Sequence, residues 1–95
     1  MGILRLFRSK KPRDHFAERR AHLMAHGRIC DGRIIDTETN GRGEIVFYLY
    51  TLNGVDFESS ELLDEEQRRD PLRYAPGAKV GVRYDPKNQG NSMLV

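Results

Sequence analysis

The dipeptide Asn53-Gly54 constrains the fold of this chain more than any other feature of the sequence. It separates two stretches in which apolar and polar residues alternate, and Asn-Gly is the preferred dipeptide of a two-residue β-hairpin turn. A turn of this length fixes the strand register, so Leu52 faces Val55 and Tyr50 faces Phe57. The residues that this hairpin is predicted to point into the core are Tyr48, Tyr50, Leu52, Val55, Phe57 and Ser59.

The opposite face of the same hairpin is polar near the turn and apolar at its far end, where Phe47 faces Ser60 and Ile45 faces Leu62. An apolar sheet face needs a cover. A helix is predicted over residues 14–26, because the segment begins with a good N-cap residue and Gly27 follows it. Its apolar side carries Phe16, Leu23 and Met24, which are expected to pack over Ile45, Phe47 and Leu62. If Phe47 is buried there, alanine in its place costs roughly 3 kcal/mol or more, and a cost under about half a kcal/mol indicates exposure.

Further strands complete a mainly β domain. The patterns predict strands over residues 28–37 and 44–52, joined by a tight turn at residues 40–43, and a short capped helical connector that begins at Asp64. Pro76-Gly77 suits a type II turn, and Val80, Val82 and Tyr84 alternate inward after it. A turn over residues 86–91 and a last strand over residues 92–95 follow. Five short antiparallel strands are expected to curl into a half-open barrel, SH3-like or OB-like, with the N-terminal helix packed on it.

Charge is distributed unevenly along the 95 residues, which are predicted to comprise a flexible basic arm at residues 1–13 and a single domain at residues 14–95. Residues 1–28 carry eight Lys or Arg against two acids, a charge of +6, and the whole chain carries +2, which leaves −4 for the rest. The arm therefore favours an anionic membrane surface as a contact. Its candidate contact residues are Arg5, Arg8, Lys10, Lys11 and Arg13. The lack of a membrane-spanning run, of an export signal and of a second cysteine favours a cytoplasmic location, peripheral to the inner membrane.

Residues with catalytic or metal-binding potential are few. His22 and His26 are one helical turn apart and are the only candidates for a metal site, but two ligands on one helix are short of the four of a structural zinc site. Cys30 has no visible partner base, so a filler or surface thiol is the expected role. The acids that could pair as carboxylates lie at turns and exposed strand positions: Asp36, Glu38, Asp56, Glu58 and residues 64–66. The sequence predicts no enzyme, no cofactor and no catalytic residue.

A family resemblance adds to this interpretation. The segment Tyr48-x-Tyr50-Thr51-Leu52-Asn53-Gly54-Val55-Asp56-Phe57-Glu58-Ser59, with Pro76-Gly77-x-Lys79-Val80-x-Val82-x-Tyr84-Asp85-Pro86-Lys87-Asn88 and Ser92-x-Leu94, resembles the bacterial family called domain of unknown function 3592. The resemblance covers about residues 27–94 and implies a β-domain with a membrane-associated role. Members usually carry transmembrane helices, which this chain lacks. Gln89 replaces a usual proline, the connector over residues 64–74 is long, and the family supplies no catalytic residues.

These observations predict a small binding or scaffolding module, a monomer or weak homodimer. Its partner is a protein or an anionic membrane surface. A single-stranded nucleic acid is the alternative, because small barrels bind bases on aromatic rings next to basic residues. The basic residues available for that role are Arg33, Arg42, Lys79 and Arg83. The net acidic body and the inward direction of most rings count against it.

Overall fold

The computed structural model describes residues 15–95, with side chains from residue 17 onward. The predicted basic arm, residues 1–13, and the predicted N-cap Asp14 lie outside the described residues. In chain order the elements are α2 (His15–His26), β1 (Arg28–Asn40), β2 (Gly43–Leu52), β3 (Val55–Leu62), α3 (Glu65–Arg68), the 3-10 helix η1 (Pro71–Tyr74), β4 (Lys79–Asp85) and β5 (Asn88–Leu94).

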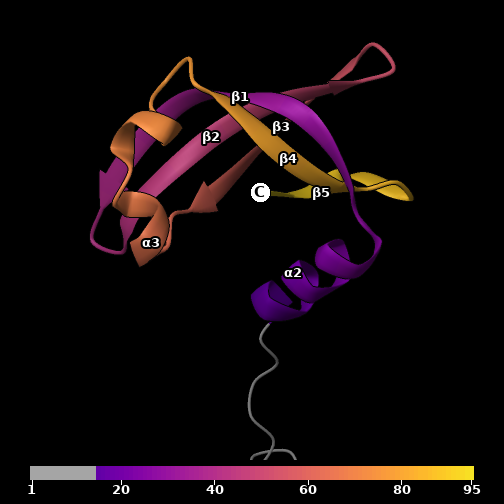
Figure 1. Ribbon diagram of the computed structural model, residues 1–95, viewed down its shortest axis with the longest axis horizontal. Coiled ribbons are helices and arrows are strands. Elements are labelled where there is room, and N and C mark those ends of the chain that lie inside the picture. Colours follow the sequence, from indigo (N-terminus) through magenta and orange to yellow (C-terminus); the bar gives the residue numbers. More distant parts are fainter. Residues whose placement is uncertain (1–14) are drawn as a thin grey trace, which may run out of the picture.

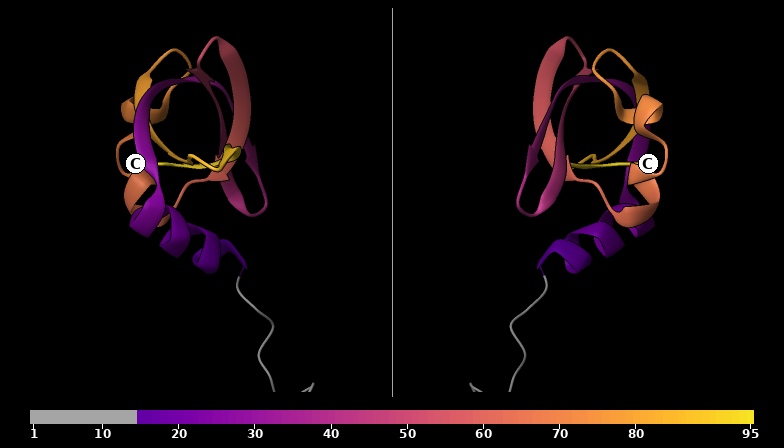
Figure 2. Two further views of the ribbon diagram at one scale, coloured as in Figure 1. Left: turned by 90° about the vertical axis from the view of Figure 1, so that its right-hand side faces the viewer. Right: turned by 90° about the vertical axis from the view of Figure 1, so that its left-hand side faces the viewer.

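The five strands form one antiparallel sheet in the order β3-β2-β1-β4-β5. The sheet curls until its two edge strands, β3 and β5, lie close to each other, and the result is a nearly closed barrel (Figures 1 and 2). The predicted mainly β fold with one N-terminal helix and a short helical connector is confirmed. Because β1 pairs with both β2 and β4, and the helical connector joins β3 to β4, the topology is that of an OB-like barrel.

The register of the β2–β3 hairpin is as predicted, with Leu52 opposite Val55 and Tyr50 opposite Phe57. Asn53 and Gly54 have φ angles of 52° and 81°, which a type I′ turn requires. Tyr48 and Tyr50 are buried as expected. The prediction is wrong for Val55, which is 53% exposed because it lies at the turn, where the hairpin extends past the core.

Two other turns depend on single side chains or glycines. Gly77 has φ 90° and the amide of Ala78 donates to the Ala75 carbonyl at 2.9 Å, as in the predicted type II turn. The β4–β5 turn is shorter than predicted, since β5 begins at Asn88 rather than at residue 92. The Asp85 carboxylate accepts the Lys87 amide at 2.8 Å, which stabilises this tight turn. The first hairpin is longer than expected, because β1 continues to Asn40.

Helix α2 contacts β4 and β5, so the prediction that it covers Ile45, Phe47 and Leu62 is wrong. The reason is the length of the connection. Only Gly27 separates the helix from β1, and the first residue of β1, Arg28, pairs with Tyr84 of β4. The helix therefore stays next to β4 and its neighbour. Leu23 is fully buried, whereas Met24, predicted to be packed, is 59% exposed.

The interior of the barrel is filled by side chains. Leu63 and Tyr74, on either side of α3, join the same buried cluster as the strand residues. The remaining buried members are Ile34, Val46, Tyr48, Tyr50, Val82 and Leu94, with Val80 and Tyr84 packed against them as predicted.

Candidate binding surface

Aromatic rings occupy the centre of the barrel. Tyr50 lies between Phe57, at 5.4 Å between ring centroids, and Tyr84, at 6.5 Å, and both pairs are nearly parallel. The Tyr48 hydroxyl hydrogen-bonds the Ser92 hydroxyl at 2.8 Å. Burial raises the pKa of Tyr48. These rings pack in the interior of the barrel, so a candidate binding surface is sought on its outside.

The seam between β3 and β5 is bridged by side chains. The two strands are parallel, because each neighbour in the five-stranded order is antiparallel. The Glu61 carboxylate accepts the Leu94 amide at 2.9 Å, the Tyr50 hydroxyl donates to the Gln89 carbonyl at 2.6 Å, and Arg19 of α2 donates to the Ser92 carbonyl at 2.9 Å. Side chains from three elements thus satisfy polar groups along the backbone of β5 and close the barrel.

Glu61 is a residue that the sequence reasoning missed. It is 4% exposed, and its second oxygen accepts a 3.3 Å hydrogen bond from the Gln67 side chain. The alternation of side chains along β3 could have revealed it. Glu61 lies opposite Val46 and on the same inward-facing side of β3 as Phe57 and Ser59. An acid at an inward position of a strand indicates a buried hydrogen-bond acceptor.

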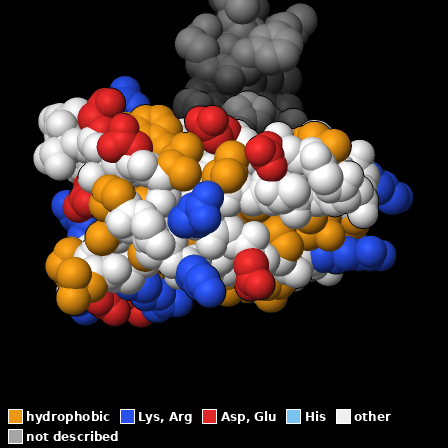
Figure 3. Space-filling model, turned by 90° about the horizontal axis from the view of Figure 1, so that it is seen from above, with side chains coloured by type: hydrophobic (Ala, Val, Ile, Leu, Met, Phe, Trp, Pro, Cys, Tyr) orange, Lys and Arg blue, Asp and Glu red, His pale blue; other side chains and the backbone are white. Residues whose placement is uncertain are grey.

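The outer face of β2 carries an apolar row that α2 leaves uncovered. Ile45, Phe47 and Leu49 alternate with the buried residues of this strand and are half-buried, and Leu62, opposite Ile45, is 41% exposed. We call these four residues the outer patch. Figure 3 shows part of the barrel surface, where hydrophobic side chains reach solvent between charged ones. A contiguous apolar row of this kind is typical of an interaction surface.

Acidic residues flank the outer patch on both sides. On β1, Glu38 lies opposite Ile45 and Asp36 opposite Phe47. On β3, Glu58 lies opposite Leu49, and Asp56 lies on the same face opposite Thr51, beyond the end of the patch. All four acids are exposed. Four of the carboxylates considered from the sequence therefore lie beside the outer patch, whereas residues 64–66 lie at the start of α3. One base, Arg33, lies opposite Leu49.

The basic residues proposed for nucleic acid are only partly brought together. Arg33 and Lys79 lie directly opposite each other and line a hollow of about 410 Å³ with Asp31, Leu49 and Thr51. Arg42 lies in the β1–β2 turn. The Arg83 side chain lies against Gly27, at the end of β4 nearer to α2. No stripe joins these four residues in the described structure.

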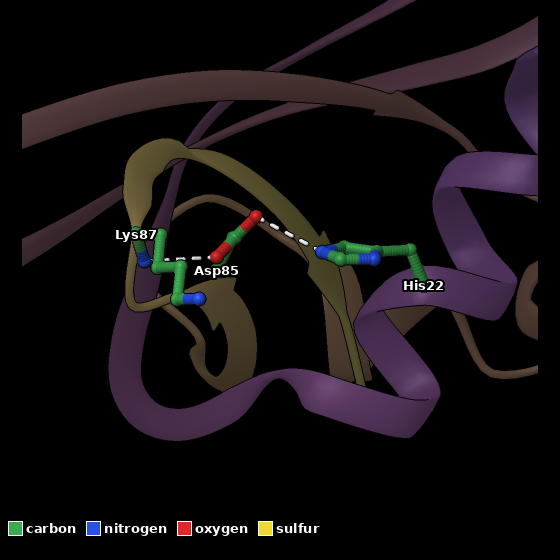
Figure 4. Close-up of polar contacts among 3 residues, drawn as sticks. All are labelled: His22, Asp85 and Lys87. Carbon is green, nitrogen blue, oxygen red and sulfur yellow. Dashed lines mark hydrogen bonds and ion pairs between the residues drawn. The ribbon is translucent and has the colours of Figure 1, made fainter.

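The histidine pair lies beside the β4–β5 turn. His22 Nε2 is 3.1 Å from Asp85 Oδ2, and the two side chains with Lys87 are drawn in Figure 4. The hydrogen bond from the Lys87 amide holds the pKa of Asp85 below its usual value, and the hydrogen bond with the His22 ring lowers it by a smaller amount. The His26 ring centroid is 5.1 Å from that of His22. Among residues 15–95, no three His, Cys, Asp or Glu side chains are grouped as metal ligands.

Cys30 is half-buried and packs against the core. Burial, with a smaller contribution from Asp31, raises the pKa of its thiol. A raised thiol pKa is the opposite of what an activated nucleophile needs. The position fits the expected filler role.

Residues 25–95 match the family model of a domain of unknown function (DUF3592). The chain belongs to the DUF3592 family. No curated protein and no solved structure matches the chain significantly. The match confirms the resemblance drawn from the hairpin and turn motifs, and it extends over all five strands of the barrel.

This DUF3592 domain has short helices. In the part of the chain that the structure describes, neither α2 nor α3 has the length and apolar character needed to cross a membrane.

Proposed function

We propose that this chain is a small non-enzymatic binding module that contacts a partner protein through the outer patch. The observation that carries the proposal is the pairing of a filled barrel interior with a half-buried apolar row, Ile45, Phe47 and Leu49, that no helix of the described residues 15–95 is seen to cover extensively. A site for chemistry on a small substrate needs a concave pocket with converging polar groups. An apolar row with a charged border instead suits a protein contact, in which an apolar centre is surrounded by a polar rim.

The charges support a protein partner over a nucleic acid. Asp36, Glu38, Asp56 and Glu58 border the patch, and they would repel a phosphate backbone. Most aromatic rings of the barrel also face inward, which removes them as stacking platforms. Single-stranded nucleic acid is the second candidate, because Arg33 and Lys79 line one hollow.

A place at the inner face of a membrane is the second part of the proposal. Its support is the sequence of the basic arm, in which Ile3, Leu4, Leu6 and Phe7 alternate with Arg5 and Arg8 and precede Lys10, Lys11 and Arg13. Apolar residues interleaved with cations bind anionic lipid surfaces weakly and reversibly.

The test of the partner contact is site-specific photo-crosslinking in the native host. p-Benzoylphenylalanine is incorporated at Phe47 and, as the matched control, at Leu72, which is 82% exposed on η1. The expected result is a discrete cross-linked product from position 47 that position 72 does not give. Identical products from both positions, or none from position 47, would refute the outer patch as the contact.

Two binding assays test the membrane location and the nucleic-acid alternative. Co-sedimentation with anionic vesicles that is lost on deletion of residues 1–12 supports the membrane location, and unchanged or absent binding rejects it. Retention on single-stranded DNA that falls steeply with salt, and that Arg33→Glu with Lys79→Glu abolishes, would replace the protein-binding proposal with the nucleic-acid alternative.

A further inference from the structure

Another segment of the same chain has apolar residues and charges that match those of the outer patch. On β1, Glu38 and Asp36 lie opposite Ile45 and Phe47. On β3, Glu58 lies opposite Leu49, and Asp56 lies opposite Thr51, the next residue of that face. A ligand for this surface therefore needs apolar side chains with cations on both sides of them. Residues 3–11, Ile-Leu-Arg-Leu-Phe-Arg-Ser-Lys-Lys, have this composition.

We propose that residues 3–11 bind the outer patch of the same molecule and cover it, as an intramolecular occupant of the surface that the proposed function assigns to a partner. The apolar residues Leu6 and Phe7 would contact Phe47 and Leu49. The cations of the segment would face the four bordering acids. Exposed ion pairs of this kind contribute little each, so the apolar contact is the main source of affinity.

The length and origin of the segment fit this docking. The first turn of α2 points to the side of the barrel on which β2 and β3 lie (Figure 2). The chain from Phe7 to His15, eight residues long, spans at most about 29 Å when fully extended. Residues 3–11 carry +4 and residues 29–95 carry −4, so the two parts attract each other.

This docking would make the partner surface and the membrane compete for one segment. When anionic lipid takes residues 3–11, the outer patch is uncovered and free for its partner. The domain would then bind its partner preferentially at the membrane. The inference rests on the outer patch being a binding surface, but its test does not require the partner.

Zero-length carbodiimide cross-linking of the full chain tests the proposal, because it joins an amine to a carboxylate only when they touch. Lys10 and Lys11 should form several-fold more cross-links with the acids beside the patch than with three exposed control acids near α3. The bordering acids are Asp36, Glu38, Asp56 and Glu58, and the controls are Asp64, Glu65 and Glu66.

Variants and vesicles complete the experiment. Leu6→Ser with Phe7→Ser should abolish the excess, Ser9→Ala should leave it unchanged, and added anionic vesicles should reduce it. Links spread evenly over all seven acids, links confined to covalent dimers, or an excess that survives the Leu6 and Phe7 changes would overturn the proposal. Cross-links that persist when vesicle binding is absent would reject the membrane location alone.

Discussion

Removal of the Glu61 carboxylate should open the seam of the barrel at one measurable position. Its hydrogen bond from the Leu94 amide, 2.9 Å long, joins β3 to β5 in a buried environment. A hydrogen bond to a charged group contributes about 1.5–3 kcal/mol, and an orphaned buried amide costs a similar amount. The bond to Gln67 is longer, 3.3 Å, and half-exposed, so it adds less than about 1 kcal/mol. Glu61→Ala should therefore cost about 2–4 kcal/mol of unfolding free energy.

Two further variants sharpen this prediction. Glu61→Gln keeps a carbonyl acceptor for the Leu94 amide and should cost about 1–2 kcal/mol, since a neutral acceptor bonds roughly half as strongly. Glu58→Ala, an exposed acid three residues earlier on the same strand, is the control and should change stability by less than about 0.5 kcal/mol. The measurements are urea unfolding and amide hydrogen exchange. If Glu61→Ala costs no more than the Glu58 control, or the Leu94 amide keeps its protection, the seam is closed by other contacts and the reasoning is wrong.

Three more outcomes follow from burial and ionisation. Leu23→Ala should cost about 2–5 kcal/mol by urea unfolding, because the side chain is fully buried, whereas the exposed neighbour Met24→Ala should stay within about 0.5 kcal/mol. The Asp85 pKa lies below 3.8 in the folded chain, so the ionised carboxylate stabilises the fold above pH 3.8, and this stability is lost as the pH falls through the folded-state pKa. Asp85→Asn should reduce the loss of stability in acid, and an unchanged dependence of unfolding free energy on pH would contradict this. The Tyr48 pKa lies above 10.0, so stability should fall as pH rises beyond 10, and less steeply in Tyr48→Phe; equal slopes would exclude Tyr48 as the cause.

The position of Phe47 illustrates the limit of local patterns. The sequence predicts its strand, its face and its partner Ser60, all of which follow from a two-residue turn and from the alternation of side chains. It does not predict what lies over that face. The structure leaves Phe47 half-buried without α2 above it, so Phe47→Ala is expected to cost less than the roughly 3 kcal/mol of a fully buried position.

Local sequence by itself determined the turns at Asn53-Gly54 and Pro76-Gly77, the register of the β2–β3 hairpin, the α3 cap at Asp64 and the mainly β class. Each depends on residues close together in the chain, whose backbone preferences and hydrogen bonds act within a few positions. The tertiary structure alone decided that α2 contacts β4 and β5, that Glu61 bonds the Leu94 amide across the seam, and that the acids of β1 and β3 border one apolar row. These contacts join residues distant in sequence, and they exist only once the order of the strands has brought β3 next to β5 and placed β4 beside the start of β1.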